Sequence, residues 1–540
     1  MSFDASHIVI NNIKLPINAS HEEAFSVALA RLRRLGISTK DIKLSIFRRS
    51  IDARRQSDIR FVYSVSAFGS FGKLNAERLK ANDMMPVDFR AEIEVTAGDT
   101  PIFSPPVIVG SGPAGLFAAL MLAEQGYRPI VLERGGSVAE RQLAVKRLGS
   151  EHILNPETNI QFGAGGAGTF SDGKLVTRIN DRLTSYVLER FIEFGAPESI
   201  RYIAKPHIGT DVLSVVVDRI LLRIAELGGR VEYNTKFIRP IVRGDRVVAA
   251  LTSRGEIKTD ALILAIGHSA RDTYATLISD NMAIEAKDFS VGMRIEHLAD
   301  DIDRALYGSF AGNERLGRAE YNLSYDTKNR GVYTFCMCPG GEVVAAASEE
   351  GGVVVNGMSY NSRGGRNSNS AVVASVFRSD FGATPMAAIE FQRKIEMAAF
   401  SAAGGDYRAP IVTVGDFLSG VCETAPKRIV PTYMNGENVS LVSPEKYLPT
   451  FITNSIRAAL LAFDKKIAGF AARDAVLTGP ETRTSSPIRI LRDHETRLAY
   501  TYRNLYPAGE GAGYAGGITS AAIDGIKTAI ALIKEYRPIE

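Results

Sequence analysis

The stretch 105–135, PPVIVGSGPAGLFAALMLAEQGYRPIVLERG, decides the fold of this chain. Its pattern predicts a short apolar strand, a glycine-rich turn, a helix over 116–124 and a second strand that ends at Glu133. The turn Gly110-Ser-Gly-Pro-Ala-Gly115 matches GxGxxG, whose glycines allow a tight turn, a close approach of the backbone to a pyrophosphate and close helix packing. The helix start offers free N–H groups to phosphate, and Glu133 can accept hydrogen bonds from ribose hydroxyls. The stretch therefore predicts a dinucleotide-binding unit.

Two other segments match the same glycine pattern, at 163–168 and 511–516. Around 163–168, the preceding ETNIQF is not a clear buried strand and the following TFSDGK is a loop, so a second dinucleotide fold is not expected there. We interpret this segment as a loop whose backbone contacts a bound dinucleotide beyond its pyrophosphate. The segment at 511–516 follows a predicted strand over 505–508 with Glu510 at its tip, and a long helix is predicted to begin near Ile518.

Changes of pattern along the chain indicate several domains. Residues 1–95 follow the order strand, helix, strand, strand, which is typical of a small α+β domain, and prolines and glycine mark 95–106 as a linker. Short β-like runs between 286 and 445 contrast with the strand–helix pattern on either side. We therefore expect a basic N-terminal α+β domain at 1–95, the first part of the nucleotide-binding domain at 104–285, an inserted substrate domain at 286–445 and the second part of the nucleotide-binding domain at 446–540.

The composition is that of an ordinary globular protein. With 540 residues, 45% of them hydrophobic and 23% charged, the chain can bury a large core and shows no sign of disorder. It has no uncharged apolar run of ~18 residues and no basic-then-apolar start, so neither membrane insertion nor secretion is expected. Three cysteines are too few for a disulfide framework. These features together predict a cytoplasmic protein.

The small positive charge lies in the N-terminal domain. Residues 1–95 hold 15 Lys and Arg against 11 Asp and Glu, which accounts for the whole net charge of +4. The excess is concentrated in RLRR at 31–34 and in the stretch 47–60. A partner that carries phosphates is one interpretation. A solvated surface is the favoured one, because Asp residues interrupt the basic run.

Several stretches together resemble a bacterial family of FAD-dependent dehydrogenases of poorly characterised function that carry an extra N-terminal domain. They are RRSIDARR, GSGPAGLFAALMLAEQG, QFGAGGAGTFSDGKL, KPHIGTD, LAIGHSARDT, CMCPGGEVVAAASE, GPETRTSSP and GEGAGYAGGITSAAIDGI. The resemblance implies an α/β fold: a Rossmann-like FAD-binding domain with a parallel sheet, helices and a β-meander, an inserted β-rich substrate domain and the small N-terminal α+β domain. It also implies non-covalent FAD. Because the sequence predicts only one complete dinucleotide fold, any NAD(P)H is expected to bind only transiently, as an electron donor.

The same resemblance assigns residues to the cofactor. In related flavoproteins an acid at the last strand end binds the ribityl chain, here Glu510, and the following helix start faces the flavin. The residues expected to bind FAD are Gly110, Ser111, Gly112, Pro113, Ala114, Gly115, Glu133, Arg134, Gly165, Gly166, Ala167, Gly168, Lys174, Phe237, Ala265, Ile266, Gly267, Gly509, Glu510, Gly517 and Ile518. No HxxxH or CxxC spacing occurs, so no metal is expected.

Three side chains are candidates for catalysis. His207 lies in KPHIGTD, just before a helix that Thr210 or Asp211 is expected to cap. Cys336 and Cys338 end a β-like run, and period-two alternation predicts both thiols on one strand face, opposite Phe335 and Met337. A thiol near the flavin would serve as proton donor or redox partner. The simpler interpretations are an ordinary loop histidine and two small buried side chains, and His268 is expected to be structural.

Three functions are compatible with these features. The favoured one is an FAD-dependent oxidoreductase that acts on an unknown small molecule. The second is a flavoprotein that modifies RNA and binds tRNA through the basic N-terminal domain. The third is a flavin-binding regulator without catalysis.

Overall fold

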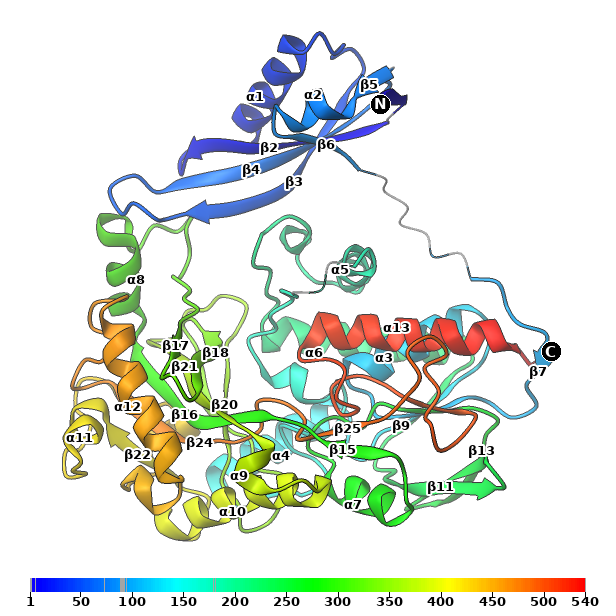
Figure 1. Cartoon of the computed structure of the whole chain (residues 1–540), viewed down its shortest axis with the longest axis vertical. Coiled ribbons are helices and arrows are strands. Elements are labelled where there is room, and N and C mark those ends of the chain that lie inside the picture. The colour runs from blue at the N-terminus through cyan, green and yellow to red at the C-terminus, as the bar shows by residue number, and fades with distance from the viewer. Residues whose placement is uncertain are drawn as a thin grey trace.

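The computed structural model describes residues 2–4, 6–71, 73–87, 93, 95–177, 179 and 181–539. Figure 1 shows a small N-terminal α+β domain at one end, a domain built on a parallel sheet, and a second domain built on a larger mixed sheet. Among the described residues, no helix has the length and apolar character needed to cross a membrane.

The N-terminal domain is an antiparallel sheet covered by a helix. The sheet order is β3-β4-β2-β6, and helix α1 packs on β2 and β4. Ser20 is the N-cap of α1, and its side chain accepts from the Glu23 N–H. The Glu23 carboxylate accepts from the Ser20 N–H, which completes a capping box. The elements are β1 Ser2–Asp4, β2 His7–Pro16, α1 His21–Arg34, β3 Lys43–Asp52, β4 Arg60–Phe68, β5 Lys73–Asn75, α2 Ala76–Lys80 and β6 Met84–Pro86.

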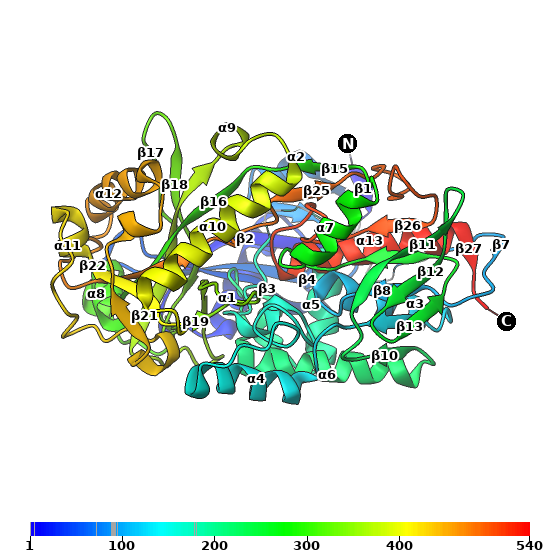
Figure 2. The ribbon, with the colours of Figure 1, turned by 90° about the horizontal axis from the view of Figure 1, so that it is seen from below.

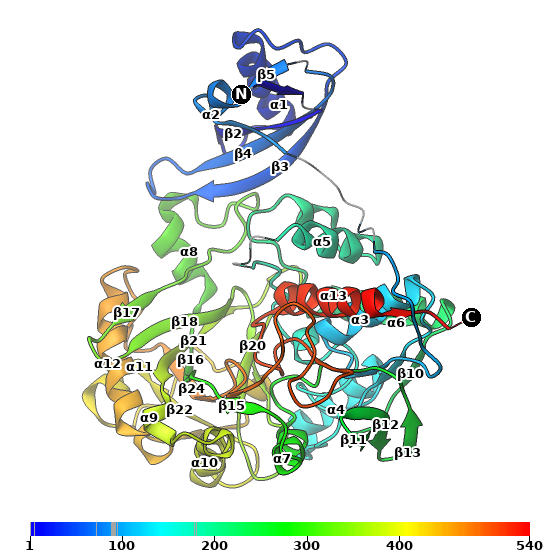
Figure 3. The same ribbon diagram turned by 45° about the vertical axis from the view of Figure 1, so that its right-hand side comes forward.

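This domain contacts the body of the protein through β3. The backbone N–H of Arg49 donates to the Tyr202 carbonyl at 2.7 Å, and the Arg49 carbonyl accepts from the Ala204 N–H at 2.9 Å. Figure 3 shows the domain above α5 (Leu183–Glu193), which lies between it and α13 (Ile518–Glu535).

A five-stranded parallel sheet forms the core of the first of the two larger domains. Its order is β10-β9-β8-β14-β26, so the first strand in the sequence, β8, lies in the middle and the order reverses beside it. The core strands are apolar triplets buried on both faces, as expected for a sheet covered by helices. The strands are β8 Val107–Val109, β9 Ile130–Leu132, β10 Arg230–Glu232, β14 Leu262–Leu264 and β26 Leu505–Pro507, and the antiparallel β11 Phe237–Arg243, β12 Arg246–Thr252 and β13 Gly255–Lys258 form the predicted meander.

Helices cover one face of this sheet, and the β-meander together with helix α7 covers the other. Helix α3 starts at Pro113, three residues before the predicted start, because proline fits the first helical position. Helix α13 packs against α3 so closely that a Cβ on Gly525 would lie 2.0 Å from the Ala114 carbonyl oxygen. The helices are α3 Pro113–Glu124, α4 Val138–Glu151, η1 Ala167–Phe170, α5, η2 Glu198–Arg201, α6 Thr210–Glu226, α7 Arg271–Ser279 and α13. The predicted linker at 95–106 contains β7 Thr100–Pro101, which pairs with β27 Tyr536–Arg537.

The second domain contains a seven-stranded mixed sheet in the order β17-β18-β21-β16-β24-β22-β23. Helix α10 packs on β22 and β24, and in the view from below it extends across the domain towards α7 (Figure 2). Strand β24 pairs with β16 and β22, so the sheet continues beyond the predicted boundary at residue 445. The elements are β15 Ile284–Ala286, β16 Phe289–Leu298, α8 Ala299–Tyr307, η3 Gly308–Phe310, β17 Ser324–Asp326, β18 Gly331–Cys338, β19 Glu342–Ala345, β20 Val355–Met358, β21 Asn367–Val376, α9 Arg378–Phe381, α10 Pro385–Ala403, β22 Ala409–Thr413, α11 Val414–Ser419, η4 Tyr433–Gly436, β23 Val439–Leu441, η5 Pro444–Lys446, α12 Thr450–Asp464, β24 Val476–Glu481 and β25 Ile488–Ile490.

Candidate active site

A cavity of about 340 Å³ lies at the carboxyl ends of the parallel strands, where the strand order reverses. Segments that follow β8, β9, β14 and β26 form one wall, and residues of β18 and β20 of the second domain form another. The predicted FAD residues that line it are Gly110, Gly112, Pro113, Ala114, Glu133, Arg134, Gly166, Ala167, Gly168, Lys174, Phe237, Ala265, Ile266, Gly267, Glu510, Gly517 and Ile518. Those outside the lining are Ser111, Gly115, Gly165 and Gly509.

The first glycine motif has the geometry of a phosphate cradle. Gly110 has a φ of +98°, and a Cβ there would lie 2.4 Å from the Ala265 carbonyl oxygen. A Cβ on Gly115 would lie 1.9 Å from the Gly110 carbonyl oxygen. Gly112 is the N-cap of α3 and makes no side-chain capping bond, so the first N–H groups of the helix are directed to the cavity without a capping side chain. Such a helix start fits the pyrophosphate of a dinucleotide.

Beside the first glycine motif, the Glu133 carboxylate accepts hydrogen bonds from three backbone segments. Its Oε2 accepts from the Ser111 N–H at 3.1 Å and the Ser111 hydroxyl at 2.6 Å. Its Oε1 accepts from the N–H groups of Gly135 and Gly163, both at 2.9 Å. These bonds use the accepting capacity of both oxygens. The predicted contact with ribose hydroxyls therefore requires one of these bonds to be exchanged, and it stays a prediction.

The glycine loop 163–168 lies between the first glycine motif and the start of α13. A Cβ on Gly166 would lie 2.8 Å from the Gly112 Cα, and a Cβ on Gly168 would lie 3.1 Å from the Ile518 side chain. The loop thus extends from the phosphate cradle to the start of α13, with Gly166, Ala167 and Gly168 on the cavity. The expected contact of this loop with a dinucleotide beyond its pyrophosphate stays a prediction.

Charged side chains border the cavity near Phe237, one of the residues expected to bind FAD. Arg134 pairs with Glu157 at 2.7 Å and with Asp272 at 2.9 Å, and its guanidinium lies 4.0 Å from the centre of the Phe162 ring. Lys236 pairs with the same two carboxylates. These bonds fix the wall that follows β9, so this rim is preformed.

At the opposite end, Glu510 and the start of α13 face the cavity together. Gly517 is the N-cap of α13 and makes no side-chain capping bond. Burial raises the pKa of Glu510 to about 7, and Lys287 only partly opposes this shift. A protonated carboxyl can donate a hydrogen bond as well as accept one.

The strand that carries the two thiols does not follow the predicted alternation. The pairing of β18 with β21 shifts register between Phe335 and Cys338, and Cys336 has a φ of +44°. Because of this bulge, Phe335 and Cys336 both line the cavity, while Cys338 is fully buried outside its lining. The prediction that the two thiols share one face opposite Phe335 is therefore wrong at this position.

Two cations hold the bulge. Arg294 Nη1 donates to the Cys336 carbonyl at 3.0 Å and lies 3.9 Å from the Cys338 sulfur, and Lys174 Nζ donates to the Met337 carbonyl. Arg294 is itself held by Glu481 through bonds of 2.7 and 2.8 Å. A hydrogen bond with the Cys338 thiol lowers the pKa of Cys336, and the positive charges of Arg294 and Lys174 lower it further. Together they outweigh burial and bring this pKa to about 6. The pKa of Cys338 is raised by this same partner and by burial.

We expect iodoacetamide to modify Cys336 in the reduced, folded protein at a rate that rises with pH through a midpoint of about 6. The thiolate is the reacting form, and a depressed pKa means that it predominates above this pH, whereas an ordinary thiol has its midpoint at about 8.5. Peptide mass spectrometry over a pH series measures the rate at each cysteine. Cys422, whose pKa burial raises, serves as the internal reference. A midpoint for Cys336 as high as that for Cys422 would contradict the expectation.

His207 does not line the cavity. Its Nε2 lies 3.1 Å from the Asn361 carbonyl oxygen, and burial lowers its pKa. The expected cap of α6 is also corrected, because Gly209 is the N-cap and no side chain caps it. The Thr210 hydroxyl instead donates to the Thr169 carbonyl, and Asp211 accepts from the Asn361 N–H.

Other residues that line the cavity were not among the predicted site residues. His268 follows Gly267 on the cavity wall, and burial together with Arg483 and Arg271 lowers its pKa to about 3, so it is neutral. Its Nδ1 lies 3.0 Å from the Ser269 hydroxyl, which donates to Gln161. The remaining polar residues in this group are Ser171, Asp172, Thr235, Thr273, Asn356, Arg483 and Thr484. The sequence feature that could have identified them is their position, because most lie in TFSDGKL and GPETRTSSP, which also carry the family resemblance.

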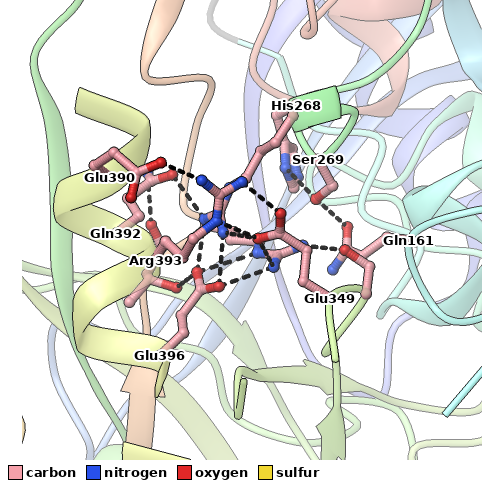
Figure 4. A network of polar contacts seen from close by, with 12 residues as sticks. Gln161, His268, Ser269, Glu349, Glu390, Gln392, Arg393 and Glu396 are labelled. Atoms are coloured by element: carbon pink, nitrogen blue, oxygen red, sulfur yellow. Dashed lines mark hydrogen bonds and ion pairs between the residues drawn. The ribbon is translucent and has the colours of Figure 1, made fainter. Parts of the chain in front are cut away.

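Behind His268, an ion network joins the two domains (Figure 4). Glu396 of α10 is 1% exposed and accepts from Arg271 at 2.7 and 2.8 Å and from Arg483 at 2.9 and 3.2 Å. Glu349 pairs with Arg271 and with Arg393. Because Arg271 begins α7 and Arg483 lines the cavity, the network positions the cavity wall relative to α10.

Comparison with protein families gives three matches. Residues 288–484 match a family described as FAD-dependent protein, C-terminal domain-like, and residues 104–145 match an FAD binding domain. Residues 7–68 match a domain of unknown function. A protein of Clostridium beijerinckii described as uncharacterized is 44% identical over 534 residues, which cover 98% of this chain and 99% of that one.

Solved structures also match, at low similarity. Glycine oxidase from Bacillus cereus is 9% identical with a TM-score of 0.33, covering 80% of this chain and 98% of that one. L-proline dehydrogenase from P. horikoshii is 12% identical with a TM-score of 0.31, covering 80% of this chain and 93% of that one.

Proposed function

Because this chain belongs to a bacterial family of FAD-dependent proteins, we propose that it is an FAD-dependent oxidoreductase that acts on a small molecule. FAD is its cofactor. When bound, FAD supplies the transfer of an electron pair to or from a substrate. The protein groups then have to hold the cofactor, orient the substrate and exclude water.

The observation that carries the proposal is a single cavity. Residues of all three glycine motifs, at 110–115, 163–168 and 511–516, and residues of the second domain line it. Gly112 and the start of α3 would hold the pyrophosphate, and Glu133 and Phe237 would lie at the adenosine end. Glu510 and the start of α13 would hold the ribityl chain and the pyrimidine edge of the flavin, where the positive end of the helix favours negative charge on the reduced ring.

The substrate would bind where the second domain closes this cavity. Phe335 and Cys336 from β18 and Asn356 from β20 reach the wall, with Arg483 and Thr484 beside them. An aromatic ring, a thiol, an amide and a guanidinium offer both apolar and polar contacts, which suit a small polar organic molecule. NAD(P)H enters this proposal only as a transient electron donor.

Purified protein is expected to carry FAD, or to take it up, and to show the absorption of an oxidised flavin. Reducing the flavin without oxygen and adding single metabolites tests the activity, because a substrate reoxidises the flavin at a rate that depends on its concentration. Protein that neither contains nor binds FAD would refute the proposal. Protein that binds FAD and whose reduced flavin reacts with no metabolite would instead favour a flavin-binding regulator.

No observation favours the RNA-modifying alternative. Basic side chains of the N-terminal domain are engaged within the protein: Arg31 donates to the carbonyls of Asn11 and Asn12, Arg54 pairs with Asp52, and Arg60 pairs with Asp58. Arg49 lies over the Phe61 ring at 4.9 Å, at the contact with the body of the protein. These pairs neutralise part of the charge that an RNA would need.

A further inference from the structure

The bulge at Cys336 brings the two thiols of β18 into a position that a regular strand does not provide. In a fully extended chain, residues two apart have Cα atoms separated by about 6.6–7.2 Å, at the upper limit for a disulfide. The φ of +44° at Cys336 breaks the extended conformation. The Cys338 sulfur folds back to 3.2 Å from the Cys336 carbonyl oxygen.

The surroundings give the two sulfurs different roles. Cys336 lines the cavity beside Phe335, and Glu510 from the flavin end lies on the same cavity. Cys338 is fully buried behind it and is packed against Gly341, whose Cβ would lie 3.1 Å from the Cys338 Cβ. Of the two thiols, Cys336 is therefore the one on the cavity, and Cys338 lies behind it.

The charges around the bulge favour an anionic sulfur there. Arg294 contacts the Cys336 carbonyl and the Cys338 sulfur, and Lys174 contacts the Met337 carbonyl between them. A glycine at 357 is required for this arrangement, because a Cβ there would lie 2.2 Å from Arg294 Nη1. Two cations beside a thiol pair promote thiolate formation, and the thiolate is the form that is oxidised.

We propose that Cys336 and Cys338 form a dithiol–disulfide couple that exchanges an electron pair with the bound flavin, which rests on the proposed function. In the oxidising direction, the S–H bond of Cys338 breaks and an S–S bond to the Cys336 thiolate forms. Two electrons pass to the flavin with two protons, one from Cys338 and one from solvent. The reverse step splits the disulfide with electrons from the reduced flavin. The couple gives the protein a second stored electron pair.

Anaerobic titration of the air-oxidised holoprotein with dithionite, followed by flavin absorbance and by cysteine alkylation, tests this couple. The wild type is expected to take up two electron pairs for each FAD, and Cys336→Ser and Cys338→Ser one each. Cys422→Ser is the matched control and should keep two, because Cys422 lies outside the cavity lining. With the protein unfolded during alkylation, so that buried thiols also react, mass spectrometry should find Cys422 alone alkylated before reduction and all three cysteines alkylated after it.

The outcomes separate this inference from the proposed function. A wild type that takes up one electron pair per FAD, with all three cysteines alkylated before reduction, overturns the couple and leaves the flavoprotein proposal standing. Protein with no bound FAD overturns the proposed function itself. If the serine variants do not fold, the wild-type stoichiometry and the alkylation pattern still decide.

Discussion

Glu396→Gln is expected to lower the free energy of unfolding by about 3–5 kcal/mol, because it removes the charge that compensates two buried guanidinium groups. Glu396 accepts bonds from Arg271 and Arg483, which are 2% and 7% exposed, and also from the Thr482 hydroxyl at 2.5 Å. The amide keeps the shape of the side chain, so the loss reports the charge and its bonds. The partly exposed Glu349 cannot compensate both arginines.

The same network predicts how stability depends on pH. Burial acts to raise the pKa of Glu396, but Arg271 and Arg483 outweigh it and hold this pKa well below its usual range. A carboxyl with a depressed pKa contributes stability that is fully present above its unfolded-state pKa of about 4.5 and is lost as the pH falls. The difference between wild type and variant should therefore be constant near neutral pH and shrink in acid.

Denaturant unfolding of the holoprotein, followed by circular dichroism, measures the effect. Glu390→Gln on the same helix is the matched control, since Glu390 pairs with the partly exposed Arg393 at its side and its loss should cost less than about 1 kcal/mol. Equal losses in the two variants would show that the buried network does not stabilise the junction between α7 and α10.

The nucleotide fold could be predicted from the sequence because local patterns determine it. Buried apolar triplets, Gly110 and the helix after it act within one stretch of chain, and the structure places them as expected. Phe237 and the segment 265–267, which the resemblance assigns to FAD, line the cavity, and their contact with FAD stays a prediction. These positions follow the ends of parallel strands, so they meet at one edge of the sheet.

The second domain was harder to predict because its contacts depend on pairing across strands. The bulge at Cys336 arises where β18 pairs with β21, and strict alternation along β18 alone cannot reveal it. The same reason explains the sheet boundary, since β24 joins β16 and β22 from beyond residue 445. Arg294 was not singled out for the same reason: its partners Glu481 and Asn369 come from neighbouring strands.

Gly115→Ala is expected to abolish FAD binding, while Gly112→Ala is expected to weaken it without loss of fold. At Gly115 the new methyl would lie 1.9 Å from the Gly110 carbonyl oxygen and 3.2 Å from the Ile108 side chain, so α3 has to move away from β8. Such overpacking against backbone costs about 3 kcal/mol and displaces the helix start from the cavity.

At Gly112 the only neighbour of a new methyl would be the Gly166 Cα at 3.8 Å, and the φ of −66° suits alanine. The unfolding free energy should therefore change by less than about 0.5 kcal/mol. The methyl would nevertheless project where the pyrophosphate has to approach the backbone, so the affinity for FAD should fall at least about tenfold, or about 1.4 kcal/mol.

Fluorescence titration of the FAD-free protein with FAD measures the affinity, and denaturant unfolding measures the stability. Gly149→Ala is the control, because Gly149 lies within α4 with open space around its Cβ position and should bind FAD as the wild type does. If Gly112→Ala bound FAD with wild-type affinity, the pyrophosphate could not lie over the start of α3.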